Sequence, residues 1–168
     1  PEMRVAIGFV VGLGLMAAGV TLKRRELKVT SQSLCATGVV IVYAVTYACR
    51  SVYHFDFFGP VATFAMMALT TATAFVLAVE LDALVVAILG MVGGFLTPFL
   101  LSTGQDNPFA LFSYIALLDL GLIAVGFRRR WPFLSLLGAV GTAVMEVGWV
   151  TSFFMTEKVF IAMAIFLG

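Results

Sequence analysis

The most informative shortage in this sequence of 168 residues is charge. Only 11% of the residues are Asp, Glu, Lys or Arg, against about 25% in soluble globular domains. The 10 basic and 9 acidic residues nearly cancel, so no extended positive field is available to hold nucleic-acid phosphates. In contrast, 62% of the residues are hydrophobic, and a water-soluble protein of this size could not bury so much apolar surface. These proportions exclude a soluble enzyme, a disordered segment and a nucleic-acid binder, and they indicate an integral membrane protein.

Histidine and cysteine are also scarce. One His cannot form a metal site, and the two cysteines, Cys35 and Cys49, lie in one apolar run. On a helix they would be about 21 Å apart, too far for a disulfide, so we interpret them as small buried hydrophobic residues. The sequence has no phosphate-binding lysine loop, no G-x-S-x-G and no H-E-x-x-H. It therefore predicts no metal and no cofactor, and it argues against an enzyme.

Long apolar runs dominate instead. A membrane-spanning helix needs about 20 mainly apolar residues, and the chain divides into runs of about that length. The predicted fold class is all-α: a polytopic transmembrane helix bundle of about seven spans in one domain, residues 1–168. Because the last run is cut short, we expect the chain to be a piece of a longer polypeptide. The expected spans are 5–22, 33–49, 61–79, 83–101, 109–127, 133–154 and the truncated 159–168.

Prolines and one acid mark the turns between these spans. Pro60, Pro108 and Pro132 stand at or just before span starts, where the first helical N–H groups have no partner in any case. Asp82 follows the third span in a very short turn, and we expect its carboxylate to cap the fourth.

Two basic clusters predict the orientation. The first follows the first span and the second follows the fifth, so alternating spans place both on the same side of the membrane. By the positive-inside rule that side is the cytoplasm. The predicted location is therefore a bacterial cytoplasmic (inner) membrane. The clusters are Lys23, Arg24, Arg25 and Lys28, and Arg128, Arg129 and Arg130.

A short internal similarity relates these two regions. The segment 13–19, LGLMAAG, recurs as LGLIAVG at 120–126, an offset of 107 residues, and each copy is followed by basic residues. Four spans separate the copies, and an even number of crossings makes the two units parallel. The sequence thus predicts a parallel four-span repeat, with chance similarity between Leu/Gly/Ala-rich helices as the alternative.

One stretch resembles a known family. The residues GGFLTPFLLSTG at 93–104, Asn107-Pro108 and RRRW at 128–131 are similar to those of a large family of bacterial predicted multi-pass membrane proteins of unknown function. Such members are long chains with many consecutive spans, often after a soluble or coiled segment. The resemblance covers the first to the sixth span. It implies the class of protein and brings no catalytic residues.

Two acids fall inside predicted spans. Asp119 lies near the middle of the fifth span with no Lys or Arg within a helical turn, and a charge there costs about 2.5–3.5 kcal/mol on insertion scales. It must face protein or water, or stay protonated. Glu146 lies on a small, polar face of the sixth span, and we expect the two carboxyls to face each other and share a proton. The alternatives are a fixed hydrogen-bonded clasp for Asp119 and a packing face around Glu146 (Ser135, Gly138, Thr142, Glu146 and Trp149).

A second polar face runs from the middle of the second span to its outer end. It could form an outward site in which Arg50 holds an anion and His54 relays protons. The alternative is an interfacial belt of aromatic and polar side chains. Its members are Tyr43, Tyr47, Arg50, His54 and Asp56.

The fourth span contains helix-weakening residues: Gly93, Gly94, Thr97 and Pro98. In lipid the carbonyls freed by such residues need partners, and broken helices mark substrate sites in many transporters. Close helix packing is the alternative. The GxxxG spacings at Gly8/Gly12 and Gly90/Gly94 indicate contacts within the chain, a homo-oligomer or a membrane-complex partner.

These features lead to three functional hypotheses. The first is a transporter-like or channel-like bundle that moves a small molecule or ion, with Asp119 and Glu146 as protonatable groups. The second is a structural or assembly scaffold in which every polar residue serves packing. The third is a membrane-embedded enzyme acting on envelope lipid or glycan, with its site around Arg50, His54 and Asp56. All three have the lipid bilayer as their first partner.

Overall fold

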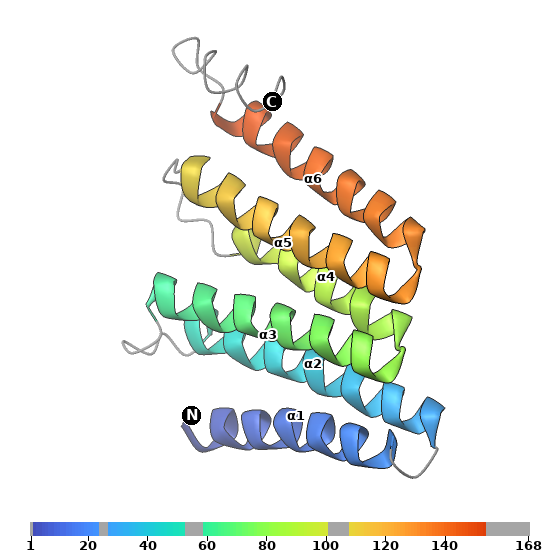
Figure 1. Ribbon diagram of the computed structural model, residues 1–168. Helices are drawn as coiled ribbons and strands as arrows, with labels where there is room; N and C mark the ends of the chain where they lie inside the picture. The colour runs from blue at the N-terminus through green and yellow to red at the C-terminus, as the bar shows by residue number, and fades with distance from the viewer. Residues whose placement is uncertain (1, 24–26, 53–58, 101–107, 154–168) are drawn as a thin grey trace.

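The computed structural model describes residues 2–23, 27–52, 59–100 and 108–153, and within these ranges it contains α-helices and no strand (Figure 1). Five of these helices are long and apolar enough to cross a membrane, and α4 is shorter at 17 residues. The predicted polytopic helical bundle is therefore confirmed, and its seventh expected span lies outside the described residues. The helices are α1 (Glu2–Lys23), α2 (Lys28–Ser51), α3 (Pro60–Leu81), α4 (Leu84–Leu100), α5 (Pro108–Arg129) and α6 (Pro132–Phe153).

Helix starts follow the prolines, as predicted. The helices α3, α5 and α6 begin at Pro60, Pro108 and Pro132, where proline's fixed φ suits the first helical residue. The expected cap by Asp82 is wrong. Because α4 begins at Leu84, its cap position is Ala83, and Asp82 instead ends α3 in a left-handed conformation (φ 52°).

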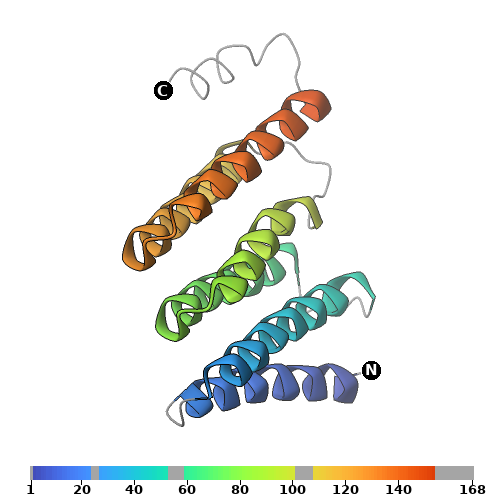
Figure 2. The same cartoon turned by 90° about the vertical axis from the view of Figure 1, so that its right-hand side faces the viewer.

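Three antiparallel hairpins, α1–α2, α3–α4 and α5–α6, stack in chain order (Figures 1 and 2). The α3–α4 hairpin is the middle layer and contacts both neighbours. The α3–α4 and α5–α6 turns lie at the end of the bundle where α1 ends and α2 begins. The core therefore lies along the inner faces of α2, α3, α4 and α5, with Val39, Phe75, Val86, Leu118 and Leu122 among its buried members.

The surface of the helices is apolar rather than polar. Large hydrophobic side chains such as Val76 (62% exposed), Leu120 (64%) and Val144 (65%) point outward from the middle of their helices. In water such a surface would be very costly, whereas in a bilayer it contacts lipid tails. Cys35 and Cys49 are free thiols and completely buried, as expected for small hydrophobic residues.

Glycines bring α1 and α2 into close contact. A Cβ on Gly12 would lie 2.8 Å from a methyl carbon of Val42, and one on Gly38 would lie 2.7 Å from the carbonyl oxygen of Gly12. The hydroxyl of Ser31 donates a 2.6 Å hydrogen bond to the carbonyl of Gly19 across the same interface. Small residues allow this approach, so Gly12 and Gly19 of α1 pack within the chain, whereas a Cβ on Gly14 would meet nothing within 4 Å.

The first and third hairpins pack in matching register. Gly12 of α1 meets Gly38 of α2, and Asp119 of α5 meets Thr142 of α6. Asp119 follows Gly12 by 107 residues, which is the offset of the sequence similarity, and α1 and α5 run in the same direction (Figure 1). A second matching pair joins Gly19 to Ser31 and Gly126 to Ser135. The partners on α2 and α6 differ by 104 residues rather than 107, and the parallel four-span repeat stays a prediction.

Candidate functional site

Asp119 lies near the midpoint of α5 and is half-buried against α6. The hydroxyl of Thr142 donates a hydrogen bond of 2.7 Å to Oδ2 of Asp119, and Oδ1 lies 3.5 Å from where a Cβ on Gly138 would be. Within the described residues no Lys, Arg or His forms an ion pair with this carboxyl. Asp119 is thus a mid-bundle acid whose polar contact is a neutral hydroxyl.

Most of the small, polar face of α6 packs against α5. Leu122 approaches Gly138, Ser135 approaches Gly126, and Trp149 makes an edge-to-face contact with Phe112 at 5.4 Å between ring centroids. Glu146 is the exception, since it makes no hydrogen bond or ion pair with any residue that the structure describes. Thr142, one turn earlier on α6, occupies the position facing Asp119 where Glu146 was expected.

The helix-weakening segment of α4 remains helical to Leu100. Pro98 has no N–H, so the carbonyl of Gly94 loses its usual partner in the helix. The hydroxyl of Tyr114 on α5 donates a 3.0 Å hydrogen bond to that carbonyl instead. Thr97 is completely buried, and its hydroxyl bonds to the carbonyl of Gly93 at 2.7 Å. Tyr114 of the neighbouring helix α5 therefore supplies the hydrogen-bond donor that the Gly94 carbonyl lacks within α4.

Tyr43 completes a polar cluster in the interior. Its hydroxyl lies 2.5 Å from the hydroxyl of Thr71 on α3, and its ring occupies the space that a Cβ on Gly93 would need, 2.3 Å away. The hydroxyls of Thr71 and Thr97 lie near that of Tyr114. We define the polar core as Tyr43, Thr71, Gly93, Gly94, Thr97, Pro98 and Tyr114, which come from four helices.

The predicted outward face of α2 is divided by this arrangement. Tyr43 points into the polar core, whereas Tyr47 and Arg50 lie partly exposed further along α2. His54 and Asp56 lie outside the described residues. In the part of the chain that the structure describes, no group of His, Cys, Asp and Glu side chains could hold a metal ion.

Sequence reasoning missed Thr71 and Tyr114. Both are buried polar side chains, at 5% and 8% exposure. The available signal was Pro98, because a freed carbonyl in lipid requires a donor from a neighbouring helix. That requirement predicts a hydroxyl or amide on a neighbouring span, but several spans carry suitable residues and only the packing selects Tyr114.

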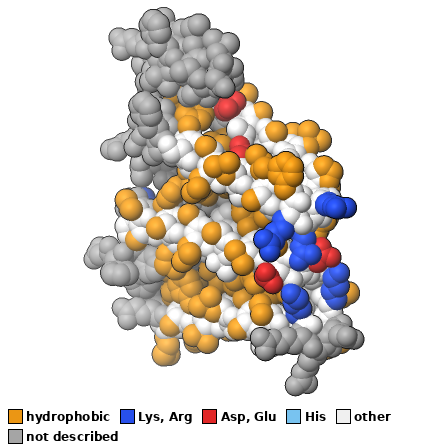
Figure 3. Space-filling model, in the orientation of Figure 1, with side chains coloured by type: hydrophobic (Ala, Val, Ile, Leu, Met, Phe, Trp, Pro, Cys, Tyr) orange, Lys and Arg blue, Asp and Glu red, His pale blue; other side chains and the backbone are white. Residues whose placement is uncertain are grey.

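Charged side chains gather at the end where the hairpin turns lie, while the rest of that face is mostly apolar (Figure 3). Lys23 and Glu80 approach to 3.6 Å, and Lys28 lies 3.1 Å from Asp82. Arg129 reaches the other oxygen of Asp82 at 3.7 Å. Residues of both predicted basic clusters thus meet on the acids of the α3–α4 turn, whereas Arg24 and Arg25 lie outside the described residues.

The same end supplies a cap for α3. The last carbonyls of a helix have no partner within it, and here three other helices provide donors. Nζ of Lys23 bonds to the carbonyl of Glu80 at 2.6 Å, the amide of Gln32 bonds to those of residues 81 and 82, and Arg129 bonds to that of Val79. These cations also face the negative end of the helix dipole. The basic residues therefore join the three hairpins.

Fold and site together define a polytopic α-helical membrane protein, with hydrogen-bonded polar groups inside the bundle and a charged cap at one end. The chain belongs to the family described as "Predicted membrane protein (DUF2339)", which matches it over residues 1–168. This match confirms the resemblance of the sequence to an uncharacterised multi-pass membrane family. A search of curated proteins found no match. A search of solved structures found none either.

Proposed function

We propose that this membrane domain is transporter-like or channel-like and that Asp119 takes up and releases a proton inside the bilayer. The observation that supports this proposal is the Asp119–Thr142 hydrogen bond at mid-bundle, without a cation on the carboxyl among the described residues. An intramembrane acid of this kind is costly to retain and is typically tied to a proton or ion pathway. The moved species would be a small molecule or ion.

The surroundings of Asp119 suit a protonation step. Of the helices packed against α5, α4 carries no charged residue, α3 carries Glu80 at the basic end, and α6 carries Glu146 one turn beyond Thr142. Loss of the proton would leave a charge whose one hydrogen bond among the described residues comes from the Thr142 hydroxyl. We propose that this charge loosens the α5–α6 contact, and that the Gly93–Pro98 segment of α4 adjusts to the movement.

The test is proton-coupled uptake in proteoliposomes that contain a pH-sensitive dye, measured over a panel of ions and small solutes. Asp119→Asn keeps an acceptor for Thr142 but cannot titrate, so it should abolish the coupled flux while the protein remains monodisperse. Asp119→Glu should restore part of it. Unchanged flux in Asp119→Asn would refute the proposal, as would the absence of any flux from the parent protein.

A scaffold is the second candidate, and one observation favours it. The interior polar groups find partners within the chain: Tyr43 with Thr71, Tyr114 with Gly94, and Asp119 with Thr142. A scaffold predicts full tolerance of Asp119→Asn and co-purifying membrane partners. A homo-oligomer or complex would use faces other than the GxxxG glycines, because Gly8, Gly12, Gly90 and Gly94 pack against residues of this chain.

For the location we propose a bacterial inner membrane with the charged end in the cytoplasm, on the basis of the positive-inside rule. Single cysteines at Arg130 and at Ser102, in a background with Cys35 and Cys49 replaced by Ala, test this in intact cells. A membrane-impermeant thiol reagent should label the Ser102→Cys variant only. Labelling of Arg130→Cys in intact cells would reverse the orientation.

A further inference from the structure

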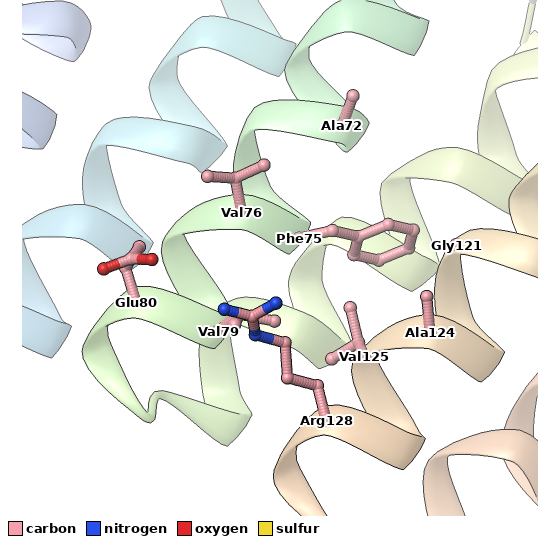
Figure 4. A pocket seen from close by; sticks show the side chains of 9 residues that line it. All are labelled: Ala72, Phe75, Val76, Val79, Glu80, Gly121, Ala124, Val125 and Arg128. Atoms are coloured by element: carbon pink, nitrogen blue, oxygen red, sulfur yellow. The ribbon is translucent and has the colours of Figure 1, made fainter.

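A groove of about 440 Å³ runs between α3 and α5 on the outer surface of the bundle (Figure 4). Phe75 forms its floor and lies in contact with Gly121, whose Cβ, if present, would be 3.1 Å from two ring carbons. Ala72 on α3 and Ala124 on α5 line its two sides, and their side chains are too short to fill it. The small residues that line the groove are Ala72 on α3 and Gly121 and Ala124 on α5.

The groove ends among the charges of the basic end. Arg128 extends from α5 across this mouth towards α3, and Glu80 stands on the α3 side (Figure 4). The two charges are not equally available. Glu80 is already 3.6 Å from Lys23, whereas Arg128 is exposed and makes no hydrogen bond or ion pair with any described residue. The mouth therefore presents a free guanidinium.

We propose that the groove binds one acyl chain of an anionic glycerophospholipid and that Arg128 holds the lipid phosphate. Guanidinium is the side chain best suited to bind phosphate, because its donors match two oxygens at once. The apolar side chains of Phe75, Val76 and Val125, which line the groove, complement a hydrocarbon chain. This inference concerns the lipid contact at the α3–α5 surface and does not depend on proton binding at Asp119.

The dimensions fit a lipid tail. From Ala72 to Glu80 the groove follows α3 for about 12 Å at ~1.5 Å per residue. One leaflet contributes about 15 Å of a ~30 Å hydrocarbon core. A tail in the groove would therefore run through most of one leaflet, with its phosphate at the level where α5 ends and the headgroups begin. The volume of the groove, about 440 Å³, lies within the usual ligand-pocket range of roughly 300–1,000 Å³.

The test is native mass spectrometry of the detergent-purified protein with equimolar palmitoyl-oleoyl phosphatidylglycerol and phosphatidylethanolamine. The parent should retain one phosphatidylglycerol with at least about fivefold preference, the factor expected for one Arg near an anionic group. Arg128→Gln should lose this preference. Arg130→Gln removes the same charge two residues away, outside the groove, and should keep it.

A second pair of variants tests the groove itself. Ala124→Leu fills the groove without changing charge and should remove the bound lipid, whereas Ala116→Leu adds the same bulk to an exposed position of α5 outside the groove and should not. An equal loss in both Arg variants, or full retention in Ala124→Leu, would overturn the proposal. Displacement of the lipid by excess inorganic phosphate would also overturn it, because the site would then recognise a free anion.

Discussion

The hydroxyl of Tyr114 on α5 lies 3.0 Å from the carbonyl oxygen of Gly94 on α4. That carbonyl is the one that Pro98 leaves without an N–H partner, four residues further along the helix. Water, which would replace the partner on a soluble helix, is absent from the hydrocarbon region. The proline and the tyrosine therefore act as a pair, and the stability of α4 depends on its contact with α5.

Removing the Tyr114 hydroxyl tests this dependence. Tyr114→Phe leaves the Gly94 carbonyl without a donor, and we expect a loss of about 1–2 kcal/mol in the free energy of unfolding. Denaturation by SDS in mixed micelles, followed by circular dichroism, measures it. Tyr47→Phe removes a hydroxyl from α2, and Tyr47 makes no hydrogen bond with any described residue, so it should change little.

The double variant separates the pair from other effects. In Pro98→Ala the new N–H can bond to Gly94 within α4, so Tyr114→Phe should cost much less in that background than in the parent. A double-mutant cycle from the same denaturation measurements gives the coupling. Equal costs in the two backgrounds would show that Tyr114 stabilises the bundle by another route.

The close contact between Gly93 and Tyr43 makes a second prediction. A Cβ at position 93 would lie 2.3 Å from the Tyr43 ring, so Gly93→Ala must displace that ring and break its hydrogen bond to Thr71. We expect a loss of about 1–3 kcal/mol, the usual cost of overpacking. Gly148→Ala on α6 has open space around the new methyl group and should leave the unfolding midpoint unchanged or slightly raised. Similar effects at both positions would contradict the packing described here.

Two neighbouring arginines at the charged end, Arg129 and Arg130, should contribute very differently to the free energy of unfolding. Arg129→Gln removes the donor to the Val79 carbonyl and the contact with Asp82, so we expect a cost of about 1.5–3 kcal/mol, as for hydrogen bonds to charged groups. Arg130→Gln removes an equal charge from an exposed side chain and should change the unfolding free energy little. Because both variants reduce the basic cluster equally, a difference between them isolates the cap on α3. Equal losses would assign the effect to net charge.

Thr142 offers a test of the α5–α6 interface that does not require transport. Thr142→Val preserves the shape of the side chain but leaves Asp119 without its donor, and such interhelical bonds contribute about 0.6–1.7 kcal/mol in membranes. Thr151→Val on the same helix removes a hydroxyl that, among the described residues, bonds within its own helix, at the Gly148 carbonyl. Thermal unfolding in detergent should show a lower midpoint for Thr142→Val alone. If Thr151→Val destabilises equally, the Asp119 contact has no special weight.

Much of the site could be anticipated from particular residues, and some could not. Asp119 inside a span, Pro98 in α4 and the two basic clusters are visible in the sequence because each violates or satisfies a simple rule of membrane insertion. The residues that contact them in the folded bundle cannot be identified from the sequence. Glu146 was expected to face Asp119, but one helical turn separates it from the position that Thr142 occupies. Asp82 pairs with Lys28 of α2 and Arg129 of α5 instead of capping the start of α4.

The sequence by itself determined that the chain is a membrane protein of successive helices, that α3, α5 and α6 begin at prolines, and that described residues of both basic clusters lie at one end. These properties depend on local composition and on the fixed length of a membrane crossing. Only the tertiary structure decided that the Tyr114 hydroxyl donates to the Gly94 carbonyl. It also decided that side chains of Lys23, Gln32 and Arg129 cap α3, and that Phe75 and Arg128 line one groove. Such pairings depend on the rotation and depth of each helix against its neighbours, and side-chain packing sets both only when the bundle assembles.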